Sequence, residues 1–121
     1  MINKKLLGNY GEDLACKFLI EKGYLILQRN FNCRFGEIDI VAECENIIVF
    51  VEVKSRYSLN YGNGIESINL PKVKNIINSS KYYIHLKHLY NYYIRYDVIV
   101  INLELEGNKK NIQHYEDAFR L

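Results

Sequence analysis

The sequence predicts one α/β domain in which a mixed β-sheet is flanked by helices, with the element order αβββαβ and a short final strand. Two observations carry this prediction. Residues 4–22 and 69–88 bear helix signals, while the segments between and after them bear strand signals. A length of 121 residues is typical of one compact unit, and neither linker nor repeat interrupts residues 1–121.

Both predicted helices have recognisable ends. Apolar residues recur at near-helical spacing through residues 4–22, and Gly23 follows as a C-terminal stop. The second helix begins near Asn69, a suitable N-cap, has Pro71 in its first turn and runs to about His88. The apolar positions of the first helix are Leu6, Leu7, Tyr10, Leu14, Phe18 and Leu19.

The strand signals are runs of β-branched and aromatic residues between turn signals. The Gly62-Asn63-Gly64 segment lies in a loop predicted over residues 57–67. We expect strands over residues 24–31, 36–43, 47–55, 93–103 and 111–119.

Composition indicates an ordinary globular protein, with 49% hydrophobic and 25% charged residues. The chain has no run of about 18 apolar residues that would suggest a membrane helix, and no signal-peptide pattern. Its three cysteines form no C-x-x-C pair, which favours reduced thiols. We therefore expect a cytoplasmic protein that does not associate with membranes.

Charge is distributed unevenly, although the net charge is only +2. Residues 54–96 carry seven Lys or Arg residues against Glu66 alone, and acidic residues predominate on either side. This pattern suits an enzyme that acts on a polyanion, or equally a solvated helix face. The tyrosines between Tyr82 and Tyr96 admit two interpretations, stacking on nucleic-acid bases or ordinary packing.

The predicted chemistry lies on the hairpin formed by residues 36–43 and 47–55. A two-residue turn at Glu45-Asn46 sets Asp39 opposite Glu52 and Glu37 opposite Lys54, unless a bulge intervenes. Alternation along the strands then separates polar from apolar residues. One face carries Glu37, Asp39, Glu52, Lys54 and Arg56, and the other carries Ile38, Ile40, Val51 and Val53.

Opposed carboxylates with Cβ atoms about 5 Å apart can hold one divalent cation. Mg²⁺ or Mn²⁺ would relieve the repulsion between Asp39 and Glu52. Lys54 would lie beside the metal, where it can orient a water molecule or stabilise charge on a phosphate. The alternative is a surface on which Glu37 pairs with Lys54 and Glu52 pairs with Arg56.

These residues resemble the PD-(D/E)XK nuclease signature, in which Gly36-Glu-Ile-Asp39 precedes Glu52-Val-Lys54. Over nearly its full length the chain resembles the small bacterial UPF0102 (YraN-like) family, relatives of archaeal Holliday-junction resolvases. The matching motifs are Gly8-x-x-Gly11-Glu12, Gly23-Tyr24, Arg29-Asn30, Gly36-Glu-Ile-Asp39, Phe50-Val-Glu52-Val-Lys54-Ser-Arg56, Lys72, Arg95-Tyr-Asp97-Val and Asp117-Ala-Phe119.

The resemblance implies a restriction-endonuclease-like fold with Asp39 and Glu52 as metal ligands and Lys54 as the catalytic lysine. It further implies that Glu12, on the first helix, reaches the same metal and belongs to the catalytic set. Read from the residues alone, Glu12 lies off the apolar stripe and is also consistent with a solvated helix residue. Asp97 beside Arg95 indicates a structural ion pair.

Three basic residues are the predicted nucleic-acid contacts, namely Arg56, Lys72 and Lys74. A lysine at the start of a helix opposes the helix dipole, so Lys72 suits phosphate binding better than helix stability. A homodimer, as resolvase-like nucleases form, would widen the basic surface and place two sites on one duplex.

The sequence thus leads to the hypothesis of a Mg²⁺- or Mn²⁺-dependent endonuclease acting on DNA, including branched or damaged DNA. A second hypothesis is a non-catalytic nucleic-acid-binding module that keeps the fold and the basic face. A third is a protein-interaction subunit that binds neither metal nor nucleic acid.

Overall fold

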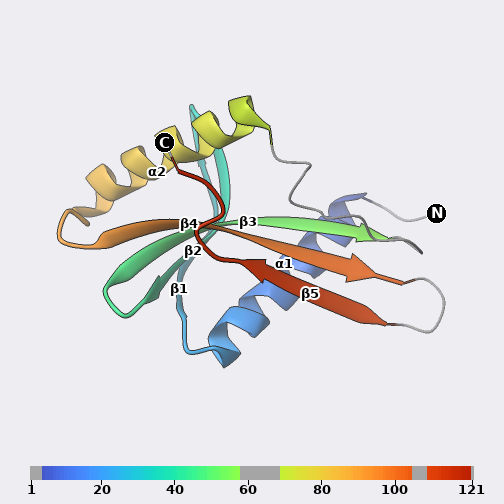
Figure 1. Ribbon diagram of the computed structural model, residues 1–121. Coiled ribbons are helices and arrows are strands. Elements are labelled where there is room, and N and C mark those ends of the chain that lie inside the picture. Colours follow the sequence, from blue (N-terminus) through green and yellow to red (C-terminus); the bar gives the residue numbers. More distant parts are fainter. Residues whose placement is uncertain (1–3, 58–68, 105–108, 121) are drawn as a thin grey trace.

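A computed structural model describes residues 4–57, 69–104 and 109–120 of the chain. It shows an α/β fold with two helices and one five-stranded sheet, as predicted (Figure 1). The elements are α1 (Lys4–Glu21), β1 (Leu25–Cys33), β2 (Gly36–Cys44), β3 (Ile47–Tyr57), α2 (Leu70–Lys87), β4 (Tyr93–Leu103) and β5 (Lys110–Tyr115). The predicted Gly62-Asn63-Gly64 loop lies outside the described residues.

The sheet is mixed, and its strands follow the chain order β1-β2-β3-β4-β5. The pair β3–β4 is parallel, and the other three pairs are antiparallel. A parallel pair needs a crossover between its strands, and α2 lies in that crossover. The basic segment that contains α2 is thereby tied to β3, the strand that carries Glu52.

The predicted helix ends are confirmed. Gly23 follows α1 with a positive φ of 94°, and its N–H donates to the carbonyl of Ile20. The side chain of Asn69 caps α2 by accepting from the N–H of Lys72 at 2.9 Å. At the other end, His88 adopts the left-handed conformation that closes a helix.

The β2–β3 hairpin has the predicted turn and register. Glu45 and Asn46 have φ values of 48° and 66°, as a two-residue hairpin turn requires. The strands then pair from Cys44↔Ile47 to Ile40↔Val51.

The paired register ends there, so neither Asp39 and Glu52 nor Glu37 and Lys54 form ladder pairs as predicted, although the Asp39 and Glu52 side chains still meet. Beyond Ile40, β2 continues to pair with β1, where Glu37 lies opposite Asn32. On β3, the N–H of Val53 donates to the Asp39 carboxylate at 2.8 Å. A side chain therefore takes the position that a backbone partner would occupy, and β2 separates from β3.

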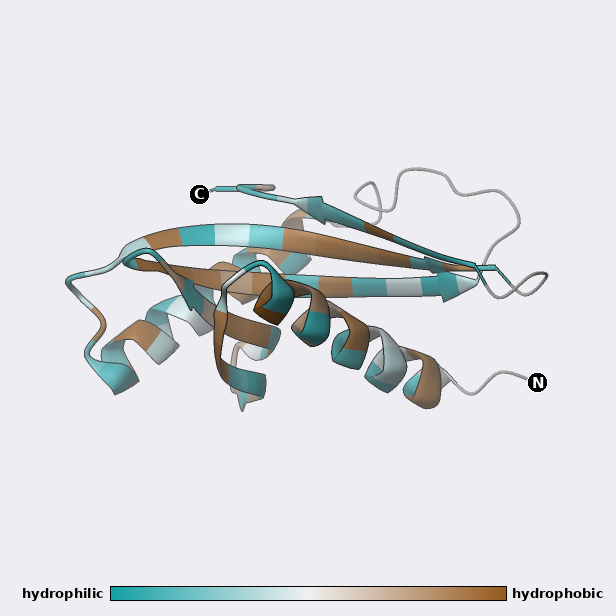
Figure 2. Cartoon of the chain, turned by 90° about the horizontal axis from the view of Figure 1, so that it is seen from below, coloured by the Kyte–Doolittle hydropathy of each residue, from teal (hydrophilic) through white to brown (hydrophobic). Residues whose placement is uncertain are grey.

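Two hydrophobic cores lie on opposite faces of the sheet, because alternate residues of β3 belong to different cores. The α1 core contains Ala15, Leu19, Ile40, Val49, Val51, Ile99 and Ile101. The α2 core contains Phe31, Ile38, Val41, Ile48, Phe50 and Tyr83. Figure 2 shows α1 lying along the sheet, with hydrophobic and hydrophilic residues alternating along the helix.

Ile38 corrects one further prediction, since it packs in the α2 core and does not share a face with Ile40 and Val51. The strand no longer follows β3 at this point, and so the faces defined by the hairpin do not extend to Ile38.

Two of the tyrosines between Tyr82 and Tyr96 pack against other aromatic rings of the protein. The ring of Tyr83 makes edge contacts with Phe31 and Phe50, and Tyr96 stacks between Phe50 and Phe119. The packing interpretation is confirmed for these two tyrosines.

Among the described helices, none combines the length and apolar character needed to cross a membrane. All three cysteines are described, and all are free thiols.

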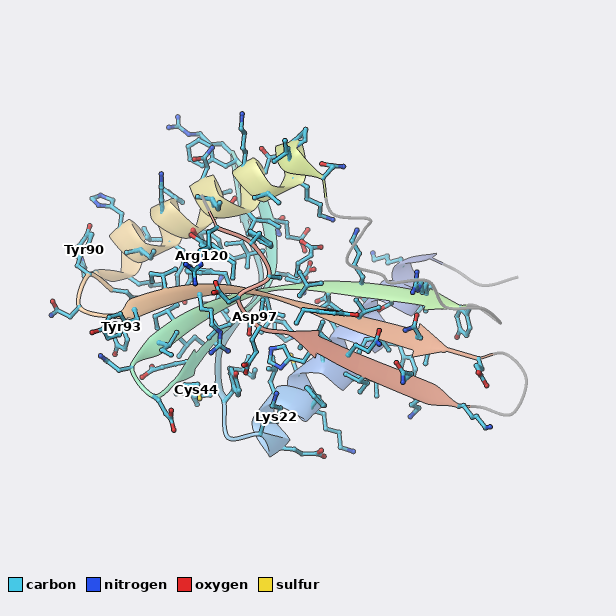
Figure 3. The ribbon with its side chains drawn as sticks, in the orientation of Figure 1. Lys22, Cys44, Tyr90, Tyr93, Asp97 and Arg120 are labelled. Atoms are coloured by element: carbon cyan, nitrogen blue, oxygen red, sulfur yellow. The ribbon has the colours of Figure 1, made fainter. Side chains whose placement is uncertain are left out.

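A buried polar network holds the C-terminal segment (Figure 3). Asp97 is fully buried and accepts two 2.9 Å hydrogen bonds from Arg95, one of 2.7 Å from His114 and one from the N–H of Asp117. The predicted Arg95–Asp97 pair is confirmed. The last strand ends at Tyr115 and not at residue 119, because Asp117 turns the chain with a φ of 53°.

We predict that Asp97→Asn lowers the free energy of unfolding by about 3 kcal/mol at neutral pH, because it breaks a buried ion pair. Burial opposes ionisation of Asp97, but hydrogen bonds from His114 and Arg95 outweigh it and lower its pKa. The stability that this group contributes is present above its ordinary pKa of 3.8 and is lost as the pH falls further. Urea denaturation should therefore show the two proteins converging below that pH.

Helix α1 approaches β3 closely at Gly11. A Cβ atom at Gly11 would lie 1.6 Å from Ser55 Oγ and 2.8 Å from Ser55 Cβ, so a larger residue cannot fit without moving the helix. One turn earlier, a Cβ atom at Gly8 would meet no described atom within 4 Å. Gly11 is thus required by packing, whereas Gly8 is not.

We predict that Gly11→Ala destabilises the protein by about 2 kcal/mol, since overpacking displaces α1 from the sheet. The matched variant Gly8→Ala should stabilise it by up to about 1 kcal/mol, because alanine favours the helix. Thermal denaturation of the two variants measures the difference. Equal effects at both positions would contradict the close contact.

Candidate metal and phosphate site

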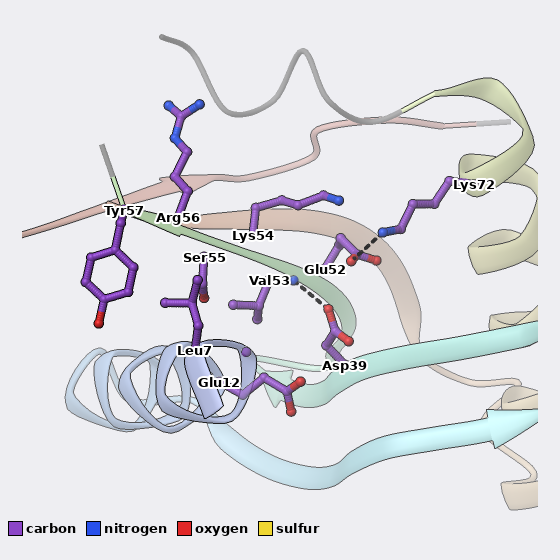
Figure 4. A pocket seen from close by; sticks show the side chains of 11 residues that line it. Leu7, Glu12, Asp39, Glu52, Val53, Lys54, Ser55, Arg56, Tyr57 and Lys72 are labelled. Atoms are coloured by element: carbon purple, nitrogen blue, oxygen red, sulfur yellow. Dashed lines mark hydrogen bonds and ion pairs between the residues drawn. The ribbon is translucent and has the colours of Figure 1, made fainter. Parts of the chain in front are cut away.

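An open cavity of about 550 Å³ lies where β2 separates from β3 (Figure 4). Its walls come from four elements: the first half of α1, Asp39 of β2, the second half of β3 and the start of α2. The lining residues are Leu7, Gly8, Glu12, Asp39, Glu52, Val53, Lys54, Ser55, Arg56, Tyr57 and Lys72. All four predicted catalytic residues are among them.

Asp39 is the central acidic group of the cavity. Burial, together with the negative charge of Glu52, raises its pKa to about 8, although the hydrogen bond from Val53 acts in the opposite direction. The two carboxyl groups are close enough to share a hydrogen bond when one of them is protonated. Asp39 therefore occupies a position where its negative charge lacks sufficient compensation.

Glu52 is partly compensated by a lysine from the opposite element. Its side chain is 7% exposed, and its Oε1 atom lies 3.1 Å from the Nζ atom of Lys72. Burial opposes the charge of Lys72, but the attraction of Glu52 prevails and raises its pKa. Burial and the nearby Lys72 ammonium lower the pKa of Lys54. The alternative pairing of Glu52 with Arg56 is not what the structure shows, because Lys72 is the partner.

Glu12 reaches the cavity from α1, with 13% of its side chain exposed. Arg29 of β1 lies 3.6 Å from Glu12 and 2.8 Å from Asp13, and so it holds this part of the helix against the sheet. Burial and the charge of Glu37 raise the pKa of Glu12, although Arg29 opposes this shift. Glu12 is thus a largely buried residue of the site and not a solvated helix residue.

Three carboxylates converge on one point. Oxygen atoms of Glu12, Glu37 and Asp39 all lie within 4.8 Å of one another. The predicted ligand set is Asp39, Glu52 and Glu12, of which Glu52 forms an ion pair with Lys72 in this structure. Glu37 was not predicted as part of this cluster because the predicted register paired it with Lys54, although Glu37 lies two residues from Asp39 on the same strand.

Two of the three predicted phosphate-binding residues line the cavity, and the third does not. Lys72 and Arg56 line the cavity, and Arg56 Nε also donates to Asn102 at 2.6 Å. Figure 4 shows Arg56 and Lys54 on one side of β3, with Ser55 and Tyr57 directed toward α1. Lys74 is exposed on α2 and lies outside the described lining.

The fold and the cavity define a class of small α/β protein, in which a mixed sheet between two helices gathers carboxylates and lysines where two strands separate. A sequence profile of the uncharacterised protein family UPF0102 matches residues 11–101. The chain belongs to this family.

Its relatives cover almost the whole chain. It is 53% identical over 117 residues to a UPF0102 protein of Clostridium perfringens, covering 97% of this chain and 96% of the relative. It is 44% identical over 116 residues to one of Clostridium botulinum, covering 96% and 95% respectively. The identity to one of Clostridium acetobutylicum is 44% over 120 residues, covering 99% and 98%.

We predict that Asp39→Asn stabilises the protein when no divalent cation is present. The raised pKa of Asp39 means that the folded wild type is favoured at low pH and loses stability as the pH rises from about 4 to about 8. Asparagine imitates the protonated acid, so the advantage of the variant should grow over this interval. Thermal denaturation at several pH values measures this, since a gain of 1 kcal/mol in the free energy of unfolding of Asp39→Asn would raise its Tm by about 4 °C.

The matched control is Glu21→Gln, which removes an exposed carboxylate from the far end of the same helix that carries Glu12. Its Tm should follow that of the wild type at every pH. A parallel pH dependence for Asp39→Asn and the wild type would contradict the charge strain at Asp39.

Proposed function

We propose that this protein is a Mg²⁺- or Mn²⁺-dependent endonuclease that hydrolyses phosphodiester bonds in DNA, including branched or damaged DNA. One observation carries the proposal: carboxylates from α1, β2 and β3 meet two lysines in one open cavity. The resemblance of the Asp39, Glu52 and Lys54 motif to PD-(D/E)XK nucleases supports it.

The acidic groups suit a hard divalent cation, which prefers carboxylate oxygens. Asp39 and Glu12 would hold it, with Glu37 or Glu52 as a further ligand. When bound, such a cation polarises a phosphate oxygen and makes a coordinated water more acidic. It would also relieve the repulsion that raises the pKa of Asp39.

The lysines would act on the phosphate. Lys54 follows Glu52 by two residues, lies on the same side of β3 and therefore faces the same space. Its ammonium would stabilise negative charge that develops on the phosphate during attack by water. Lys72 and Arg56, at two sides of the cavity, would hold the phosphates on either side of the reacting one.

A second candidate is a DNA-binding module without catalysis. The ion pair between Lys72 and Glu52 favours it, because Glu52 has a partner without any metal. In this case the basic residues would bind phosphates with strong salt dependence and without a requirement for divalent cations.

The experiment that tests the proposal is cleavage of labelled DNA by the wild type and by Asp39→Ala in Mg²⁺ or Mn²⁺. The substrates are a single strand, a duplex, a flap and a four-way junction. We expect the wild type to cleave at least one of them and Asp39→Ala or Glu52→Gln to lose about 10³-fold in rate, because each removes a charge required by the metal.

Glu21→Ala serves as the control, since it removes a carboxylate that lies outside the cavity. Retained cleavage in both Asp39→Ala and Glu52→Gln would exclude this active site. Salt-sensitive binding by the wild type, without cleavage of any substrate, would favour the binding module.

The proposal includes the cytoplasm as the site of action, a setting with which the three free thiols are compatible. It also includes a homodimer, which would present two cavities to one duplex. Sedimentation of the full chain, alone and with duplex DNA, measures whether two copies assemble.

A further inference from the structure

A second cavity, of about 520 Å³, adjoins the candidate active site. Tyr57, at the end of β3, lines both cavities. From Tyr57 the second cavity extends to Tyr10 of α1, the end of β4 and the start of β5. Its lining residues are Tyr10, Tyr57, Leu103, Glu104, Lys109 and Lys110.

The walls of this cavity combine aromatic rings with cations. Tyr10 is 41% exposed and Tyr57 is 37% exposed, so both have surface available to a ligand. The ammonium of Lys110 lies 5.6 Å from the centre of the Tyr10 ring. Leu103, which is buried, is the one aliphatic residue of the described lining. Aromatic rings beside lysines are the features that bind single-stranded nucleic acids, where bases stack and phosphates meet positive charge.

The charge of the cavity indicates which part of a nucleotide it receives. Glu104 lies in the lining with Lys109 and Lys110, so the positive charge is partly balanced. A phosphate group is better placed in the first cavity, which holds Lys54, Arg56 and Lys72. The second cavity, with its two tyrosines, suits the base.

We propose that the second cavity binds an unpaired base of the strand whose phosphate lies in the first cavity. This inference rests on the proposed function and narrows its substrate class. A base inside a continuous duplex is paired and stacked, and it cannot enter such a cavity without leaving the helix. The preferred substrate is therefore DNA with a single-stranded segment next to the phosphate that is attacked.

The test measures binding of two DNA probes to the full chain by fluorescence anisotropy. One probe is a blunt hairpin duplex, and the other is the same hairpin with a single-stranded extension that contains 2-aminopurine. Ca²⁺ replaces Mg²⁺, and gels verify that the DNA stays intact. We expect the wild type to bind the extended probe about tenfold more tightly, with a change in 2-aminopurine fluorescence upon stacking.

Tyr10→Ala should remove this preference and the fluorescence change, while binding of the blunt duplex stays as in the wild type. Tyr10 lines the second cavity and not the first, so the variant leaves the catalytic groups in place. Tyr10→Phe should retain the preference because its ring still stacks. Tyr93→Ala is the control, since Tyr93 is 74% exposed and begins β4, whereas Leu103 ends it. Circular dichroism verifies the fold of each variant.

The outcomes separate the two proposals. Equal binding of both probes by the wild type, or an equal loss for both probes in Tyr10→Ala, would overturn the base-binding cavity and leave the nuclease proposal standing. If the wild type binds neither probe and cleaves none of the substrates described above, both proposals fail.

Discussion

The candidate site depends on one hydrogen bond, which the backbone N–H of Val53 donates to the carboxylate of Asp39. It replaces a bond that the neighbouring strand would otherwise supply. Because a side chain satisfies this backbone group, β2 can leave β3 without an unpaired buried donor. The cavity lies where the two strands separate, and the same interaction holds Asp39 in its wall. Strand geometry and site geometry therefore have a common cause.

Opposite charges come to this cavity from different elements. Glu12 belongs to α1, Asp39 to β2 and Glu52 to β3, whereas Lys72 belongs to α2. The pairing of Glu52 with Lys72 satisfies one acid, but Asp39 keeps a raised pKa. An arrangement selected for stability alone would replace these buried charges with apolar groups. The raised pKa of Asp39, in a cavity that also holds Lys54, Arg56 and Lys72, is the feature on which the proposed cation and polyanionic substrate rest.

Much of the fold was predictable because its signals are local. Asn69, Pro71 and Gly23 mark helix ends through their own backbone and side-chain properties, and Glu45-Asn46 specifies the hairpin register. The same register was extended too far. Nothing in the alternation of β2 reveals that pairing stops after Ile40, since that depends on how the two strands diverge around the Asp39 carboxylate.

For the candidate site, the residues were predictable from the sequence, but several of their contacts were not. The motif identified Asp39, Glu52 and Lys54, and the resemblance added Glu12; all four line one cavity. The contact of Glu52 with Lys72 and the approach of Gly11 to Ser55 join residues far apart in sequence, and they are set by the packing of helices on the sheet. The approach of Glu37 to Glu12 is likewise a contact between distant residues, and the predicted register paired Glu37 with Lys54.

The parallel pairing of β3 with β4 has a consequence for how the protein acquires its structure. The β2–β3 hairpin joins neighbouring segments and closes a short loop, whereas the parallel pair requires closure of the long crossover that contains α2, so we expect the hairpin to form first. Lys72 travels with that crossover. With the hairpin formed and the crossover open, Glu52 would lack this partner, so closure of the crossover also supplies the counter-charge of Glu52.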